Sequence, residues 1–237
     1  MIKKYFINLI CLALIFTAFD AYASKIALST VIVDFNAKNK KSKRFIDVVV
    51  TNISENETAY VEVKVNEILN PGTDDEKRVE VEKGAKDSLI VSPQKMVIPP
   101  KAKKSLRFVT LHKDLKKDKI YRVNVAPVVG QVDAEGSNFI KVLIAYDVLV
   151  IVRPDQEVVD FDVKRNGKKI TFTNKGNTNV LFRRAEQCPK NSSNPEQCKI
   201  IPGHRLYADT SFTQDLPFDT NVEYTYSVDG ELKNATY

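Results

Sequence analysis

Beyond its first two dozen residues, the chain alternates apolar and polar side chains and contains no convincing helical stretch of ten or more residues. Residues 59–69, AYVEVKVNEIL, show the pattern: Val61, Val63 and Val65 fall on one side, and Tyr60 and Glu62 on the other. A repeat of two is the signature of a β-strand with one buried face. The alternation therefore predicts an all-β fold.

Similar stretches recur along the chain and are rich in Val, Ile, Phe, Tyr and Thr, the residues that strands favour. Asn166-Gly167 and Asp229-Gly230 are two-residue signals for tight hairpin turns. Many short strands separated by turns indicate antiparallel sandwiches. The predicted strands span residues 26–35, 44–52, 59–69, 105–110, 120–127, 139–152, 158–165, 168–173, 179–184, 200–207 and 223–228.

The first 23 residues, MIKKYFINLICLALIFTAFDAYA, have the composition of an export signal. Two lysines precede an apolar run, and Ala21-Tyr22-Ala23 has the small-x-small form of a cleavage site. A membrane anchor is the alternative, but Asp20 ends the run short of the roughly 20 residues that a spanning helix needs. We therefore expect a secreted chain that does not insert into the membrane.

Two cysteines, Cys188 and Cys198, remain once Cys11 is removed with the signal. An even number of cysteines in an oxidising compartment indicates a disulfide. The alternative, a reactive thiol pair, lacks the close spacing of a redox motif. The bridge would close a short loop rich in Pro, Asn and Ser.

The remaining composition argues against an enzyme or a metal protein. The chain has only two His, at positions 112 and 204, and no CxxC, HExxH, Gly-rich phosphate loop or nucleophile motif. Its net charge of +6 resides partly in lysine-rich runs typical of solvated loops, and an exported chain has no nucleic acid to meet. We expect no metal, no cofactor and no catalytic residue.

The sequence from Arg153 to Glu157, RPDQE, is the best candidate for a domain boundary. Pro154 cannot donate a strand hydrogen bond, and the charged residues after it do not suit a sheet interior. The predicted organisation is a signal peptide at 1–23, one domain at 24–154, and a smaller domain at 155–237 that carries both remaining cysteines.

One stretch, residues 138–152 (NFIKVLIAYDVLVIV), is unusually long and apolar for a strand, whose usual length is five or six residues. Its even positions are all apolar from Ile140 to Val148, and both parities are largely apolar from Leu143 on. Periodicity leaves two readings open: a central strand buried on both sides, or an edge strand whose apolar row is offered to another chain.

The order of several motifs resembles that of the periplasmic chaperones of the chaperone–usher pilus pathway, over the whole chain beyond the signal. The second half looks like the alternate, alpha-type subgroup. The motifs are NPGT at 70–73, VSPQKMVIPPKAKKSLRF at 91–108, YRV at 121–123, the long stretch that closes on Arg153-Pro154, NKGNTN at 174–179, the two cysteines, and Pro202-Gly203.

The resemblance implies two immunoglobulin-like sandwiches in a boomerang, which bind fimbrial (pilin) subunits in the periplasm and deliver them to an outer-membrane usher. In this family the chaperone lends a strand to complete the subunit's sandwich. The positions that match this donor strand are Ile140, Val142, Ile144 and Tyr146. A free chaperone must cover this row, which suggests self-association.

The sequence departs from the family where most members fix the subunit's terminal carboxylate with an Arg and a Lys. Thr30 and Leu149 occupy those positions here, so the candidate anchors are Thr30, Arg122 and Arg153. The alternative function is a secreted immunoglobulin-like adhesin or structural fimbrial subunit that uses the same strand for self-assembly.

Overall fold

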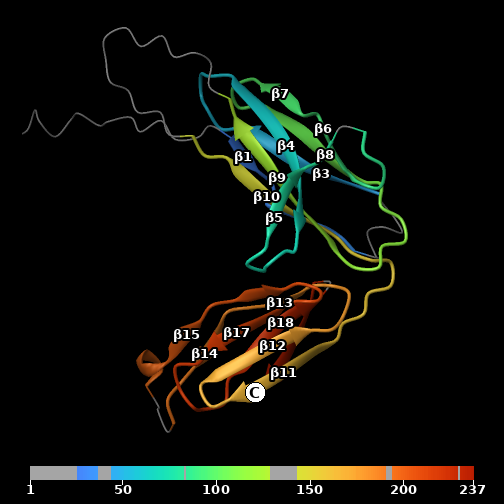
Figure 1. Ribbon diagram of the computed structural model, residues 1–237. Helices are drawn as coiled ribbons and strands as arrows, with labels where there is room; N and C mark the ends of the chain where they lie inside the picture. Colours follow the sequence, from blue (N-terminus) through green and yellow to red (C-terminus); the bar gives the residue numbers. More distant parts are fainter. Residues whose placement is uncertain (1–25, 37–43, 83, 129–142, 191–193, 229) are drawn as a thin grey trace, which may run out of the picture.

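The computed structural model describes residues 26–36, 44–82, 84–128, 143–190, 194–228 and 230–237, and Figure 1 shows their arrangement. Their regular structure consists of strands and one 3-10 turn, η2 (Pro195–Gln197), which Asn194 caps by accepting from the backbone N–H of Glu196. The strands form two sandwiches that meet at an angle (Figure 1). The prediction of an all-β fold with two sandwich domains is confirmed.

The first sandwich contains a four-stranded and a six-stranded sheet. The four-stranded sheet has the order β1-β3-β8-β6, and the six-stranded sheet has the order β2-β10-β9-β4-β5, with β7 also paired to β4. The strands are β1 (Ile26–Leu28), β2 (Ile32–Phe35), β3 (Phe45–Asn52), β4 (Ala59–Leu69), β5 (Lys77–Glu80), β6 (Leu89–Ser92), β7 (Lys95–Ile98), β8 (Lys103–Thr110), β9 (Lys119–Pro127) and β10 (Tyr146–Val152).

The second sandwich contains a three-stranded sheet, β11-β12-β17, and a six-stranded sheet, β15-β14-β18-β13-β16, with β19 paired to β18. The strands are β11 (Phe161–Asn166), β12 (Lys169–Asn174), β13 (Val180–Phe182), β14 (Ala185–Gln187), β15 (Lys199–Ile201), β16 (His204–Leu206), β17 (Ser211–Asp215), β18 (Glu223–Val228) and β19 (Glu231–Thr236).

Each sandwich has its own core, because alternate residues of its strands face inward. The first core is mainly aliphatic and includes the fully buried Phe35 and Phe108. The second core is aromatic: Phe172 stacks on Phe212 at 4.8 Å between ring centroids and meets Phe182 at 4.5 Å.

A third cluster joins the sandwiches. Ile68, Ile120, Leu149 and Ile151 project from the outer face of the six-stranded sheet of the first sandwich, and Tyr207 of the second packs on them. Gly72, in the turn between β4 and β5, also approaches this ring, since a Cβ there would lie 2.8 Å from Tyr207 Cδ2. The β4–β5 hairpin reaches toward the second sandwich at this contact (Figure 1).

Three predicted strands differ from those observed. Residues 26–35 form two strands, because a turn at Thr30 moves the chain from one sheet to the other; the Thr30 hydroxyl accepts from Ile32 N–H at 3.1 Å. Residues 200–207 are divided at Pro202-Gly203 into β15 and β16.

The third difference concerns the long apolar stretch. β10 begins only at Tyr146, and Leu143 and Ile144 are exposed instead of buried on two sides. Burial on both faces begins at Val148. β10 lies between β2 and β9, so the part from Tyr146 on is a central strand. Residues 139–142 lie outside the described part of the chain.

Candidate functional site

The segment just before β10 combines large aliphatic side chains with exposure. Leu143 is 39% exposed and Ile144 is 49% exposed, although both are residues that usually enter a core. Ile144 has the same parity as Val148, Val150 and Val152, so an extended chain continues the inward row of β10 through Ile144. Ile140 and Val142, the other predicted members of this row, lie outside the described residues.

Tyr146, the fourth predicted member, belongs to the chain's own core. Its ring packs on the first hydrophobic core, and its hydroxyl donates to the carbonyl oxygen of Ile26 at 3.1 Å. The end of the row that an outside partner can reach therefore lies upstream of Tyr146.

β10 itself is held on both sides. It pairs antiparallel with β9 over its whole length and parallel with β2 from Leu149 to Val152. The Leu149 N–H donates to Val31 O at 3.0 Å, and the Arg153 N–H donates to Phe35 O at 3.0 Å, which extends the parallel pairing at both ends. A central strand with this many ladder bonds is a rigid base for the residues that precede it.

Two of the predicted anchor positions, Thr30 and Leu149, are occupied by the fold itself. The Thr30 hydroxyl closes its local turn through Ile32, and Leu149 is 7% exposed in the cluster between the sandwiches. Arg122 lies directly opposite Leu149 on β9. Its Nε is 3.9 Å from a carboxylate oxygen of Asp147, and this carboxylate also receives a hydrogen bond from Arg78 at 2.9 Å.

Arg153, the third predicted anchor, is 3% exposed and has partners on both sandwiches. Its guanidinium donates to both carboxylate oxygens of Asp34 on β2, at 2.8 and 3.0 Å, and to Thr178 Oγ1 at 2.6 Å. Burial works against the charged form, but the hydrogen bond and charge of Asp34 outweigh it, so the pKa of Arg153 is raised. The geometry gives Arg153 a structural role between the sandwiches.

Asp118, just before β9, forms a second link that sequence reasoning missed. Its carboxylate accepts from the Asn179 N–H at 2.7 Å and from Asn179 Nδ2 at 2.5 Å, while its own N–H donates to Asn177 O at 3.0 Å. Burial raises the pKa of the Asp118 carboxyl, and the hydrogen bonds from Asn179 and the charge of Arg153 only partly oppose this. A single Asp in a lysine-rich loop carries no sequence signal for such a role.

Cys188 and Cys198 form the predicted disulfide, in the second sandwich, between the end of β14 and the start of β15. Around the bridge, Thr220 donates to the Cys188 carbonyl at 2.7 Å. Among the described residues there is no group of three or more His, Cys, Asp or Glu placed to hold a metal ion. None of their helices is long and apolar enough to cross a membrane.

Comparison with known proteins defines the class. Residues 25–159, more than half of the chain, match the family model of the pili and flagellar-assembly chaperones, PapD N-terminal domain. The chain therefore belongs to this family of chaperones. It is a homologue of the fimbrial chaperones of the chaperone–usher pathway, and the alternative of an adhesin or structural subunit is not favoured.

Particular relatives agree with this assignment. The chain is 28% identical to a CFA/I fimbrial protein of Escherichia coli over 179 residues, 72% of this chain and 73% of that protein. It is 28% identical to a CS1 fimbrial protein of E. coli over 164 residues, 66% and 68% of the two chains. Among solved structures, the class 5 fimbriae chaperone CfaA superposes with a TM-score of 0.63 at 24% identity, covering 90% of this chain and 97% of that one.

Proposed function

We propose that this protein is a periplasmic chaperone that captures fimbrial subunits by lending them the segment from Ile140 to Ile144, the capture segment, and then delivers them to an outer-membrane usher. The observation that carries the proposal is the exposed Ile144 immediately before a rigidly held central strand. Solved structures with the same fold include a SafA pilin in complex with the SafB chaperone and a CsuC–CsuE chaperone–tip subunit complex. Those complexes support fimbrial subunits as the partners.

The energetics suit a tight but exchangeable complex. Burying Ile140, Val142 and Ile144 in a partner contributes about 1.5–3 kcal/mol each, roughly 5–9 kcal/mol gross. Strand pairing adds register and hydrogen bonds, and ordering of the two chains offsets much of the gain. An incoming segment with better packing can therefore displace the chaperone.

Of the candidate anchors for a subunit carboxylate, Arg122 is the most accessible cation. Its side chain is 32% exposed, against 3% for Arg153, and a carboxylate ligand would compete with Asp147 for it. Arg122→Gln should therefore weaken subunit capture without unfolding the chain, and unchanged capture would remove Arg122 from the site.

Ile144→Asp tests the capture segment. We expect at least a tenfold loss of co-purification with the fimbrial subunit, because the substitution removes an apolar contact and forces a charge into the subunit's groove. Ile53→Asp is the matched control, since Ile53 is 51% exposed in a loop of the same sandwich and Ile144 is 49% exposed. Equal capture by both variants would disprove the donor role.

The remaining parts of the proposal concern processing and the free state. We place the signal peptide at residues 1–23, the first domain at 24–154 and the second at 155–237, and the two sheet pairs on either side of Pro154 support this division. The mass of the periplasmic protein tests the cleavage site. Size-exclusion chromatography of the free chaperone tests self-association, which Ile144→Asp should weaken. We also assign the chain to the alpha-type subgroup on its second-half motifs.

A further inference from the structure

The second sandwich has a hollow on its edge that the capture segment does not use. β13 and β14 are separated by Arg183 and Arg184, and β15 and β16 by Pro202 and Gly203, so the two interruptions face each other. Gly203 lets the strands approach, since a Cβ there would lie 2.8 Å from Phe182 O and 3.0 Å from Arg184 N. The hollow has a volume of about 540 Å³.

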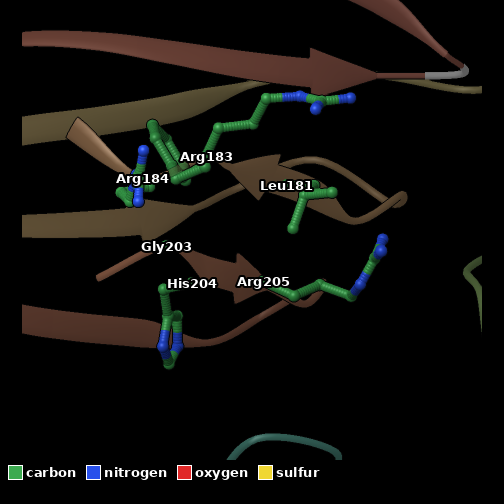
Figure 2. Close-up of a pocket in the computed structure, with 7 residues that line it drawn as sticks. Leu181, Arg183, Arg184, Gly203, His204 and Arg205 are labelled. Carbon is green, nitrogen blue, oxygen red and sulfur yellow. The ribbon is translucent and has the colours of Figure 1, made fainter. Parts of the chain in front are cut away.

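Three arginines line this hollow. In Figure 2, Arg183 and Arg205 extend toward the same side with Leu181 between them, while Arg184 and His204 lie at the other end. Arg205 and Leu181 are cross-strand partners on β16 and β13, and Arg183 follows Leu181 by two residues, which places these three on one face. We refer to Arg183, Arg184 and Arg205 as the arginine cluster.

The arginine cluster carries little compensating negative charge. Arg183 and Arg184 are exposed, and within the described part of the chain neither side chain has an ion pair or a hydrogen bond. The Arg205 guanidinium donates to the side-chain oxygen of Asn179, which is neutral. Burial lowers the pKa of Arg205, and the nearby charge of Arg153 adds to this effect. An anion in the hollow would relieve this repulsion.

We infer that the arginine cluster binds carboxylate side chains of an extended acidic segment in a partner protein. Guanidinium groups pair with carboxylates through two parallel hydrogen bonds, and β16 offers an edge because it pairs only with β13 among the described strands. Leu181 supplies an apolar contact between the charges, which a polypeptide can use and a small inorganic anion cannot.

The surrounding charge favours a narrow acidic segment over an anionic bilayer. Glu186 and Glu223 are exposed cross-strand partners on β14 and β18, further along the same sheet. Their carboxylates would face the headgroups of a bilayer that covered this sheet and would repel them. A segment lying along β16 would touch the arginine cluster alone.

This site is separate from the proposed capture of subunits. The arginine cluster lies on the second sandwich, whereas Ile144 precedes β10 in the first. Variants of the arginine cluster should therefore keep subunit capture, and a failure of the Ile144→Asp test would leave the arginine cluster untouched.

The test uses the full-length processed protein and a fluorescent peptide of alternating Glu and Thr. Fluorescence anisotropy should show binding that weakens as salt rises. The double variant Arg183→Gln, Arg184→Gln should bind about tenfold more weakly, since each lost charge-assisted pair contributes to affinity. Lys168→Gln, Lys233→Gln is the matched control, because it removes the same charge from exposed positions of the same sandwich and should bind as the unmodified protein does.

Three results would overturn the inference. One is equal binding by the arginine variant and the lysine control, which would reduce the effect to net charge. Another is equally tight binding of a Lys-Thr peptide. The third is binding of anionic phospholipid vesicles or inorganic phosphate with no binding of the acidic peptide. Unchanged circular dichroism and melting temperature of both double variants establish that they are folded.

Discussion

Replacing Arg153 with Met tests whether its ion pairs hold the end of β10 in place. The substitution removes the two hydrogen bonds to Asp34 and the one to Thr178, while the Met side chain fills most of the space. Asp34 on β2 and Glu157, whose carboxylate is 3.4 Å from the guanidinium, then lose their cation. The change therefore acts on the β2–β10 pairing and on the contact between the sandwiches together.

The expected cost follows from burial. Removing one member of a buried ion pair costs about 3–5 kcal/mol, because a charge stays behind without its partner. The Asp34 side chain is 30% exposed and can recover some hydration, so we expect the lower end, about 3 kcal/mol. With a urea dependence of about 2–3 kcal/mol per M, the unfolding midpoint should fall by roughly 1 M.

Urea unfolding followed by circular dichroism measures this loss, and Arg107→Met is its control. Arg107 makes the same two-pronged pair with Asp47, at 2.8 Å for both bonds, but its side chain is 53% exposed. An exposed pair contributes about 0–1 kcal/mol. Equal losses for Arg153→Met and Arg107→Met would refute the reasoning. Adding Asp34→Asn to Arg153→Met should cost less than the sum of the single changes.

Three other predictions concern stability. Replacing Cys188 and Cys198 with Ser should cost about 2–3 kcal/mol in urea unfolding, since the bridge closes a short loop, and a loss equal to zero would contradict this. Asn52→Leu should cost about 2–4 kcal/mol, because the buried Asn52 amide donates to three backbone carbonyl oxygens; a loss below about 1 kcal/mol would show that water replaces it. The raised pKa of Asp118 means that the folded chain takes up this proton before the unfolded chain does as the pH falls. The stability of the unmodified protein relative to Asp118→Asn should therefore rise as the pH drops through that pKa, and a difference that is constant or opposite in sign would contradict it.

Strands with a strict two-residue alternation can be predicted from the sequence because one buried face determines both their type and their extent. The alternation over residues 59–69 predicts a strand, and β4 has those bounds. By contrast, all four residues of β5 (Lys77–Glu80) are exposed, and the strand exists because β4 offers it an edge. Such a strand leaves no hydrophobic pattern to read.

Signals for the two divided strands are present but local. Pro202-Gly203 lies inside an apolar stretch, where proline and glycine commonly mark a break. The division at Thr30 depends on one hydroxyl that closes a turn, which period-two analysis cannot detect. Whether an apolar stretch stays in one sheet or crosses to another is decided by such single contacts.

The links between the sandwiches could not be predicted from the sequence, because they join residues far apart in the chain. Arg153 pairs with Asp34, 119 positions away, and Asp118 binds Asn179, 61 positions away. The sequence suggests Arg153 as a ligand for a carboxylate from outside, whereas the structure surrounds it with carboxylates from inside. A charged side chain next to a predicted boundary carries the same sequence signal in both cases.

The placement of these links bears on how the proposed capture segment would work. β10 is fixed by β2 and β9 along its length, and Arg153 secures its far end between both sandwiches. Because β10 is already ordered, a partner that pairs with the residues upstream of Tyr146 needs to order only that upstream segment. Its conformational entropy cost, about 1–2 kcal/mol per residue, would then be limited to a few positions. The fold would thus set the register of the aliphatic row in advance, and the affinity of the complex would depend mainly on how well Ile140, Val142 and Ile144 fit the partner.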